Sequence, residues 1–194
     1  MKNFLRFVFF TGFIISVFAC GNEEIAPKPK AQLRLEYPPA AYETFRDERL
    51  PFTFDKSVYA RVLIKSDTTF DIVYPDMHAR FYCTYAPVQN NLRQLLSDAD
   101  KLTYKHAIKA EGFAKPRIFE NPEKGVFARI NRVTGNAASP LQFLVTDSTR
   151  HFVNGSLYFQ SVPNYDSIRP PLRYLEKDLK HLIETWQWVD SGKK

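Results

Sequence analysis

The stretch VTDSTRHFVNGSLYF, residues 145–159, places two apolar runs on either side of a short polar segment. Each run is rich in β-branched and aromatic residues, which is typical of β-strands. The polar segment, residues 147–150, favours a turn because short side chains such as Asp and Ser bond nearby backbone amides. We therefore predict a β-hairpin. The second run contains Asn154-Gly155, and we interpret this pair as a glycine bulge within one continuous strand.

The same segment also contains the residue types of a hydrolase triad, namely Asp147, Ser148 and His151. A working triad requires a nucleophile, a base and an orienting acid that converge from different parts of a fold. The sequence has no Gly-x-Ser-x-Gly motif that would expose a serine, and no Cys-x-x-Cys or His/Cys cluster that suggests a metal site. We therefore predict no enzyme activity, no catalytic residue, no metal and no cofactor. A hydrolase remains the hypothesis to exclude.

The rest of the chain predicts alternating strands and helices. Strands are expected at 59–65, 68–74, 78–87, 117–120 (RIFE), 125–133 (GVFARINRV) and 141–147 (LQFLVTD). Apolar residues at helical spacing predict one helix over 92–112 and a second over 168–188, with Asp166 or Ser167 as the cap of the second. Short turns between neighbouring strands require antiparallel pairing. The predicted fold class is α+β, an antiparallel β-sheet packed against helices.

The amino terminus has the order of a secretory signal. A basic start precedes the apolar run FVFFTGFIISVF at 7–18, which is short for a membrane-spanning helix. The following VFAC at 17–20 resembles a bacterial lipobox, in which cleavage between Ala19 and Cys20 accompanies attachment of acyl chains such as palmitate to the cysteine. Several chains on one residue anchor firmly, since each buried CH₂ contributes about 0.8 kcal/mol. We predict a lipoprotein held in the membrane through Cys20.

These features divide the chain into a signal peptide at 1–19, the lipidated cysteine and a flexible tether at 20–32, a single globular α+β domain at 33–189, and a frayed tail at 190–194. Removal of the signal lowers the net charge from +6 to about +4. The basic residues are scattered, which argues against nucleic-acid binding. Cys83 has no second cysteine to pair with once Cys20 carries lipid, so we expect a small buried apolar side chain there.

Several segments of the chain resemble one known family. The segments NNLRQLLSDADKLTYKHAIKAEGF and GNAASPLQFLVTDSTRHFVNGSLYFQSVPNYDSIRPPLRYLEKDLKHLIETWQW are similar to the gliding motility lipoprotein GldD family of Bacteroidota. The tether segment EEIAPKPK and the segment LPFTFDKSVYA resemble the opening of that family. The similarity runs from the lipobox to Trp188, is strongest over 90–188 and is weakest over 60–80. The order of strands and helices also resembles, more loosely, the Mog1/PsbP-type α/β sandwich.

The resemblance implies a cell-envelope lipoprotein that is a non-catalytic accessory or scaffold component of the gliding motility and type IX secretion machinery. It implies a membrane anchor and envelope-protein partners, and it supplies no catalytic residue. Gly21 rather than Asp follows Cys20, so we expect the outer membrane, with the domain facing the periplasm. Glu23 and Glu24 resemble, in part, an acidic signal for surface export, which leaves the leaflet open.

Four residues are candidates for a partner surface. Asn136 and Ser139 lie in a segment of small residues that permits close backbone approach, although a wide connection between strands is the simpler interpretation. Tyr165 and Asp166 directly precede the last predicted helix.

The alternative function is a periplasmic small-molecule or glycan-binding domain. Tyrosine and phenylalanine rings provide flat apolar faces on which a sugar ring can stack. The candidates for this stacking surface are Tyr37, Tyr42 and Phe45, together with Tyr165.

Three segments match a pattern of O-glycosylation that is common in Bacteroidota envelope proteins, in which Asp precedes Ser or Thr and then an aliphatic residue or Thr. The acceptors would be Thr68, Ser148 and Ser167. Each lies at a predicted strand start, turn or helix start, where the surface can accommodate a bulky sugar. The alternative is that these Asp-Ser and Asp-Thr pairs serve only turn and capping chemistry.

Overall fold

The computed structural model describes residues 36–106, 110–160 and 164–189. All of them belong to the unit that runs from Glu36 to the end of the chain. The predicted signal peptide, the Ala19–Cys20 cleavage and lipidation site, the tether and the tail lie outside the described residues, so those predictions stay open.

The described residues form strands, two α-helices and two short 3-10 turns. The strands are β1 (Tyr42–Arg46), β2 (Phe52–Ser57), β3 (Arg61–Ile64), β4 (Thr69–Tyr74), β5 (Ala79–Pro87), β6 (Ala110–Phe113), β7 (Arg117–Asn121), β8 (Val126–Gly135), β9 (Leu141–Thr146), β10 (His151–Phe159) and β11 (Gln187–Trp188). The helices are α2 (Leu92–His106) and α3 (Tyr165–Glu184), and the 3-10 turns are η2 (Pro75–Met77) and η3 (Pro122–Lys124).

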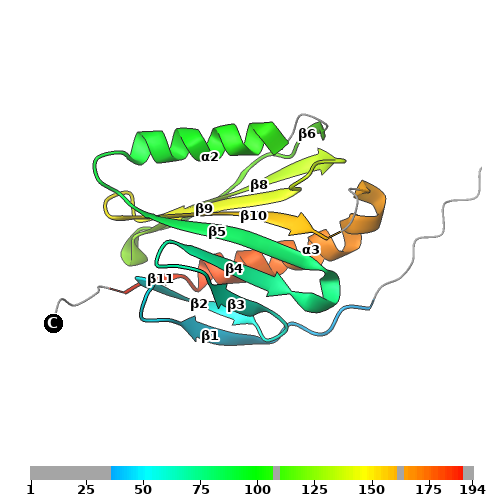
Figure 1. The fold of residues 1–194 in the computed structure, drawn as a ribbon, viewed down its shortest axis with the longest axis horizontal. Helices are drawn as coiled ribbons and strands as arrows, with labels where there is room; N and C mark the ends of the chain where they lie inside the picture. Colours follow the sequence, from blue (N-terminus) through cyan, green and yellow to red (C-terminus); the bar gives the residue numbers. More distant parts are fainter. Residues whose placement is uncertain (1–35, 107–109, 161–163, 190–194) are drawn as a thin grey trace, which may run out of the picture. The chain divides into compact units, whose positions relative to one another are not determined.

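The strands form two antiparallel sheets, which confirms the predicted α+β fold class. The large sheet has eight strands in the order β3-β4-β5-β10-β9-β8-β6, with β7 also paired to β8. The small sheet has the order β1-β2-β11. Figure 1 shows α2 over one face of the large sheet, and α3 with the small sheet against the opposite face. The domain therefore has a helix on each side of one extended sheet.

The predicted hairpin is confirmed as β9 and β10. Phe152 pairs with Thr146 directly across the turn. The predicted glycine bulge is wrong, because β10 pairs with β5 and β9 in an unbroken register through Gly155. Glycine is required there for packing, since a Cβ at this position would overlap the Phe143 ring and lie 3.0 Å from the Cys83 sulfur. Cys83 itself is buried as predicted, and burial raises the pKa of its thiol.

The main core lies between the large sheet, α3 and the small sheet. The buried apolar residues of α3 are Ile168, Leu172, Leu175, Leu179, Leu182 and Ile183. Phe52 and Phe54 of β2 stack on Trp186, with ring centroids 4.5 and 5.2 Å from the indole. Aromatic pairs at such distances contribute about 0.5–1.5 kcal/mol beyond their buried area. This core joins both sheets to α3.

The first predicted helix is confirmed at its start and wrong at its end. Helix α2 ends at His106, and Ala110–Phe113, which continue the helical spacing of apolar residues, form β6 instead. Pairing with β8 explains the change, because Phe113 lies opposite Val133 and the Thr134 hydroxyl donates to the Gly112 carbonyl at 3.0 Å. Tertiary pairing thus overrides the local helical pattern.

The second predicted helix is shifted toward the amino terminus. Helix α3 begins at Tyr165, and Asn164 is its N-cap residue. Asp166 and Ser167 therefore lie inside the first turn, and the prediction that one of them caps the helix is wrong. The helix ends at Glu184, before the predicted Trp188, because the chain turns to place Trp186 in the core and pair β11 with β2.

Candidate functional site

The hairpin turn between β9 and β10 is organised by the Asp147 carboxylate. Its Oδ1 accepts hydrogen bonds from the backbone amides of Thr149, Arg150 and His151 at 2.9, 2.7 and 2.8 Å. Ser148 adopts a left-handed backbone conformation with φ of 66°. Burial alone would raise the pKa of Asp147, but the three amides and the nearby His151 lower it overall. The carboxylate of the hypothetical triad is therefore a structural acceptor in the turn.

The His151 side chain lies among aromatic residues. Its Nδ1 is 3.0 Å from the Tyr85 hydroxyl, and its ring stacks on Trp188 with centroids 5.0 Å apart. Trp188 in turn donates from its indole nitrogen to the Gly125 carbonyl at 2.8 Å. These contacts hold the imidazole against Tyr85 of β5 and Trp188 of β11.

The structure brings together some residues of the predicted partner surface. The Tyr165 amide donates to the Asn136 Oδ1 at 2.9 Å, and Asp166 is exposed beside it. Ser139 requires a correction, because it is fully buried and cannot contribute to a surface. Its hydroxyl donates to the Leu141 carbonyl at 3.3 Å and accepts from the side-chain amide of Gln142 at 2.9 Å. Ser139 therefore stabilises the connection that precedes β9.

Two residues of the predicted stacking surface, Tyr37 and Tyr42, line a cleft of about 370 Å³ beside α3. Its complete lining is Tyr37, Pro38, Ala40, Tyr42, Pro170, Arg173, Tyr174, Lys177 and Asp178. Phe45 and Tyr165 are not part of this lining. Phe45 packs on Phe54, with ring centroids 5.1 Å apart, at the edge of the core. We call the cleft lined by Tyr37, Tyr42 and Tyr174 the tyrosine cleft.

A buried carboxyl group forms part of the tyrosine cleft. Asp178 is 3 % exposed, and its Oδ1 accepts from the Tyr42 hydroxyl at 3.1 Å. Burial raises the pKa of Asp178, against the lowering effect of the Tyr42, Tyr74 and Ser57 hydroxyl groups. Burial and the same carboxyl raise the pKa of Tyr42 to about 12. The Asp178 Oδ2 makes no hydrogen bond to any of the described residues.

The tyrosine rings of the cleft are held by stacking. Tyr37 stacks on Tyr174 with ring centroids 5.1 Å apart, and Tyr42 stacks on His181 at 3.7 Å. Arg173 and Lys177 are exposed at the same flank of α3. The cleft therefore combines aromatic faces, two cations and one buried carboxyl group, a set that suits a small ligand carrying both apolar and polar groups.

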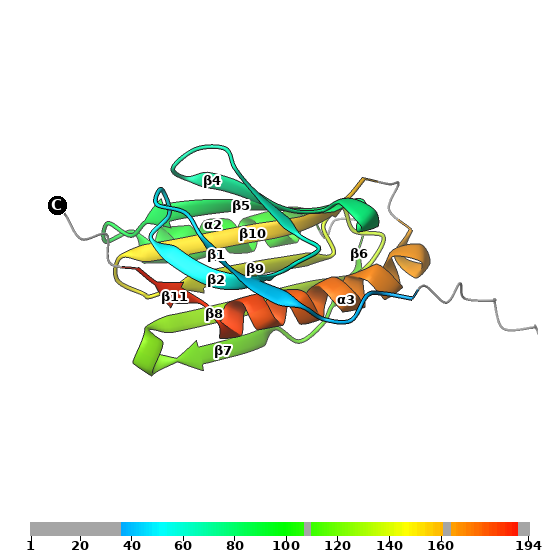
Figure 2. The ribbon, with the colours of Figure 1, turned by 90° about the horizontal axis from the view of Figure 1, so that it is seen from below.

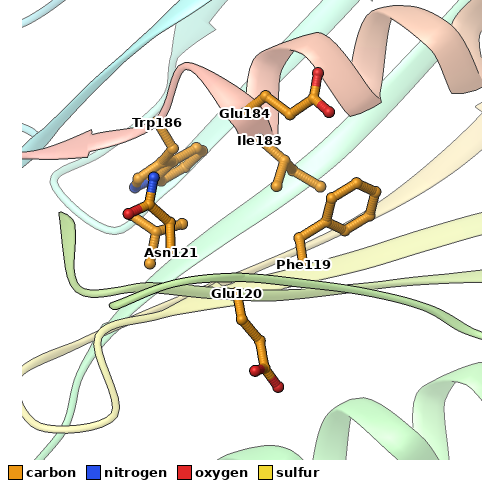
Figure 3. A pocket seen from close by; sticks show the side chains of 7 residues that line it. Phe119, Glu120, Asn121, Ile183, Glu184 and Trp186 are labelled. Atoms are coloured by element: carbon orange, nitrogen blue, oxygen red, sulfur yellow. The ribbon is translucent and has the colours of Figure 1, made fainter. Parts of the chain in front are cut away.

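A second hollow lies between the end of α3 and β7. This cavity of about 220 Å³ is lined by Phe119, Glu120, Asn121, Val126, Ile183, Glu184 and Trp186. Figure 3 shows Phe119 and Ile183 facing each other across it, while the Glu120 side chain points to the opposite side of β7. The Trp186 indole N–H is buried and finds no acceptor among the described residues. We call this space the α3-side cavity.

A third hollow lies on the other face of β7, under α2. It has a volume of about 200 Å³ and is lined by Leu96, Ile118, Phe119, Glu120, Phe127, Ala128, Arg129, Leu144 and Thr146. Arg129 forms an ion pair with Asp100 of α2. We call this space the α2-side cavity. β7 thus has a small, mainly apolar cavity on each of its two faces.

The predicted absence of a metal and the predicted glycosylation both stay predictions. Within the described ranges, no group of three or more His, Cys, Asp and Glu residues is placed to hold a metal ion. The predicted acceptors Thr68, Ser148 and Ser167 are all exposed, which is compatible with modification and leaves it a prediction.

No helix in the described part of the chain is long and apolar enough to cross a membrane.

Taken together, these elements define a small α+β sandwich domain with a tyrosine-lined cleft. A family model described as gliding motility lipoprotein GldD matches residues 22–188. This match covers most of the sequence, and the chain belongs to that family. The protein is therefore a gliding motility lipoprotein of the cell envelope. A comparison with curated proteins finds no match.

Sequence reasoning missed several residues of these hollows. Tyr174 and Asp178 lie four positions apart on α3, a spacing that places them on the same flank and could have indicated that both line one cleft. Phe119 lies in a segment predicted correctly as a strand, whereas Trp186 lies beyond the end of α3, in a segment predicted as helix. Their meeting across the α3-side cavity depends on tertiary packing, for which the sequence carries no local signal.

Proposed function

We propose that the protein is a non-catalytic accessory or scaffold component of the gliding motility and type IX secretion machinery. Lipid on Cys20 would hold it in the outer membrane, with the domain facing the periplasm. Family membership supports the role in gliding. The structure supports the proposal in two ways. Large apolar side chains are exposed where a partner protein could bind, and the carboxylate of the candidate triad is bound to backbone amides in the hairpin turn.

The observation that carries the scaffold role is the exposure of large apolar side chains on α2, β6 and β7. Four large apolar side chains are exposed there: Leu102 by 37 %, Tyr104 by 66 %, Phe113 by 49 % and Ile118 by 69 %. Tyr104 and Phe113 pack edge to face, with ring centroids 5.3 Å apart. Exposed apolar side chains in mutual contact, as Tyr104 and Phe113 are, favour a surface that a partner protein covers.

The non-catalytic part of the proposal is supported by the hairpin turn. A triad aspartate must orient the imidazole of its histidine. Here the Asp147 Oδ1 accepts the backbone amide of His151 and two neighbouring amides. The turn therefore uses the carboxylate for its own stability.

Complementation of a strain that lacks the gene tests both parts. Ser148→Gly removes the hydroxyl and suits the left-handed backbone at this position, and His151→Gln removes the imidazole. We expect the double variant to restore gliding and secretion of type IX cargo as wild type does, whereas Cys20→Ser fails. Loss of gliding in the double variant, at wild-type abundance and thermal stability, would contradict a non-catalytic role.

The alternative is a domain that binds a glycan or another small molecule, and the tyrosine cleft favours it. Its volume of about 370 Å³ lies within the range of about 300–1,000 Å³ typical of ligand sites. A panel of envelope glycans and lipids would be screened by thermal shift, since a ligand at 100 times its Kd stabilises the folded state by about 2.7 kcal/mol. Tyr37→Ala should abolish any shift that arises in the cleft, and the absence of any shift would leave the scaffold role alone.

A further inference from the structure

The outer edge of β7 is free among the described residues. β7 pairs only with β8 in that part of the chain, and Figure 2 shows it at the margin of the sheet beyond β8. An edge strand presents unpaired backbone N–H and C=O groups along its outer side. Ile118 of β7 is 69 % exposed, the highest fraction among the large apolar side chains described. The edge therefore offers both backbone hydrogen-bonding groups and an apolar contact.

The two cavities beside β7 lie on opposite faces of this edge. The α3-side cavity has about 220 Å³ and the α2-side cavity about 200 Å³. Both are below the volume of about 300 Å³ at which pockets begin to hold drug-sized ligands, so each suits one side chain. Successive side chains of a β-strand point to opposite faces of the sheet. A strand added beside β7 would therefore direct neighbouring side chains toward the two cavities in turn.

The polar groups at this edge restrict the chemistry of such a strand. Trp186 lines the α3-side cavity, and its indole N–H is a buried donor without an acceptor among the described residues. Glu120 borders the α2-side cavity, is exposed, and has no ion-pair partner within the described ranges. Arg129, the cation of the same cavity, is already paired with Asp100. The edge therefore favours a strand that brings a positive charge to Glu120.

We infer that the free edge of β7 binds an extended segment of a partner protein as an added β-strand. The segment carries apolar side chains for the two cavities and a basic side chain opposite Glu120. This mode of recognition obtains affinity from main-chain hydrogen bonds and specificity from pockets for alternate side chains. The inference rests on the proposed scaffold function and names the chemistry of its partner.

A phage-displayed library of random linear peptides tests this inference on the purified lipoprotein in detergent. We expect the enriched peptides to share neighbouring apolar residues and a basic residue, and to slow amide hydrogen exchange in residues 117–121. No enrichment, or protection confined to the tyrosine cleft, would overturn the inference. Protection of β7 without peptide that grows with protein concentration would assign the edge to a second copy and would also overturn it.

Matched variants separate the edge from general loss of structure. Ile118→Glu should weaken peptide binding by about tenfold or more, as expected for an apolar anchor in the interface. Leu63→Glu is the control, because Leu63 is 39 % exposed on β3 at the opposite edge of the same sheet. Glu120→Lys should discriminate against peptides with a basic residue, and Glu123→Lys in η3 should not. Equal losses in both members of either pair would contradict the inference.

Cross-linking in living cells distinguishes failure of the inference from failure of the proposed function. A photoreactive amino acid would replace Ile118, Tyr104 or Leu63 in turn. Cross-links from Ile118 to a segment with the selected peptide pattern would support strand addition. Cross-links to motility or secretion proteins from Tyr104 alone would overturn strand addition and leave the scaffold role standing. Absence of cross-links to envelope proteins from all three positions would count against both.

Discussion

The two helices of the domain are similar in sequence pattern and differ in what they contribute. Helix α3 has eight buried residues in its 20, and its apolar face lies in the main core. Helix α2 has 15 residues, of which Thr103 is the only buried one among those whose side chains are described. Leu102 and Tyr104 beside it are exposed by 37 % and 66 %. An amphipathic pattern therefore predicts a helix and a preferred face, and leaves open how deeply that face is covered.

The sheet explains the difference between the helices. On the α3 side it presents apolar residues such as Phe143, Val145 and Leu157. On the α2 side, the alternate positions of the same strands include the buried polar residues Gln142 and Ser156. Burial against apolar side chains contributes about 25 cal/mol per Å², so α3 is held more strongly. We infer that α3 supports the fold, whereas the surface around α2 is available for a partner.

The largest contrast is expected from the same truncation in both helices. Leu175→Ala in α3 removes a side chain that is 0 % exposed, and it should lower the free energy of unfolding by about 2–5 kcal/mol. Leu102→Ala in α2 should lower it by less than about 1 kcal/mol, because Leu102 is already 37 % exposed. Urea unfolding of the purified chain without its signal measures both values. Similar losses in the two variants would contradict the comparison.

The next contrast concerns neighbouring residues of β10 on opposite faces of the sheet. Gly155→Ala places a methyl group against the Phe143 ring and the Cys83 sulfur, and such overpacking typically costs about 1–3 kcal/mol. Ser156→Ala, on the α2 side, should change the free energy of unfolding by less than about 1 kcal/mol. Thermal unfolding of the two variants would show whether the α3 side is the tightly packed one. Equal midpoints would indicate that packing is similar on both faces.

Carboxyl groups of the two helices should respond to pH in opposite directions. Burial raises the pKa of Asp178 in α3 above the ordinary value of 3.8. Its stabilising contribution is therefore complete below that value and is lost as the pH rises through the folded-state pKa. The pKa of Asp98 in α2 is lowered by hydrogen bonds from Gln94 and Lys101, so its contribution is present above 3.8 and is lost on acidification.

Substitution by asparagine removes each titration and provides the test. Relative to wild type, Asp178→Asn should gain stability between pH 4 and pH 7, since the amide can still accept from the Tyr42 hydroxyl. Asp98→Asn should be less stable than wild type above pH 3.8, by a smaller amount because its site is exposed, and this difference should shrink as the pH falls below 3.8. The measurement is the difference in urea midpoint at a series of pH values. A flat difference for Asp178→Asn would indicate that its carboxyl titrates normally.

The sequence predicts the interior of this fold better than its margins. The hairpin of β9 and β10 has both strand composition and turn chemistry, and it is found as expected. β6 is different, because Ala110 and Phe113 continue the helical period of α2 and only pairing with β8 makes them a strand. β11 has two residues, which is too short for any periodic signal. Elements that depend on a distant partner are therefore the ones that local patterns miss.

The same distinction applies to the candidate sites. Tyr37 and Tyr42 could be singled out from the sequence because aromatic rings provide flat apolar faces for stacking. Asp178 could not, because a charged residue on the polar flank of a predicted helix is usually solvated. Its burial depends on β1, which supplies the Tyr42 hydroxyl. Ser139 shows the converse error, since small residues in a connection can serve internal packing as well as a partner.

The smallest effect is expected at the exposed start of α3, where Ser167 was a candidate both for capping and for glycosylation. Asn164 is the N-cap residue, and its side chain makes no capping hydrogen bond. Ser167 lies inside the first turn and is exposed. Ser167→Ala should therefore change the free energy of unfolding by less than about 0.5 kcal/mol in protein made without glycosylation. A loss of about 1 kcal/mol would instead restore the capping role.

The same residue provides a separate test in protein isolated from its native membrane. Glycosylation at the three predicted sites would give an intact mass above that of polypeptide plus lipid. This excess should fall stepwise as Ser167, Thr68 and Ser148 are replaced, with Ser148→Gly chosen because of its left-handed backbone. All three side chains are exposed, so a sugar on any of them would need no rearrangement of the core. A native mass equal to polypeptide plus lipid would end the hypothesis, and the Ser148 segment would then be explained by the turn that Asp147 organises.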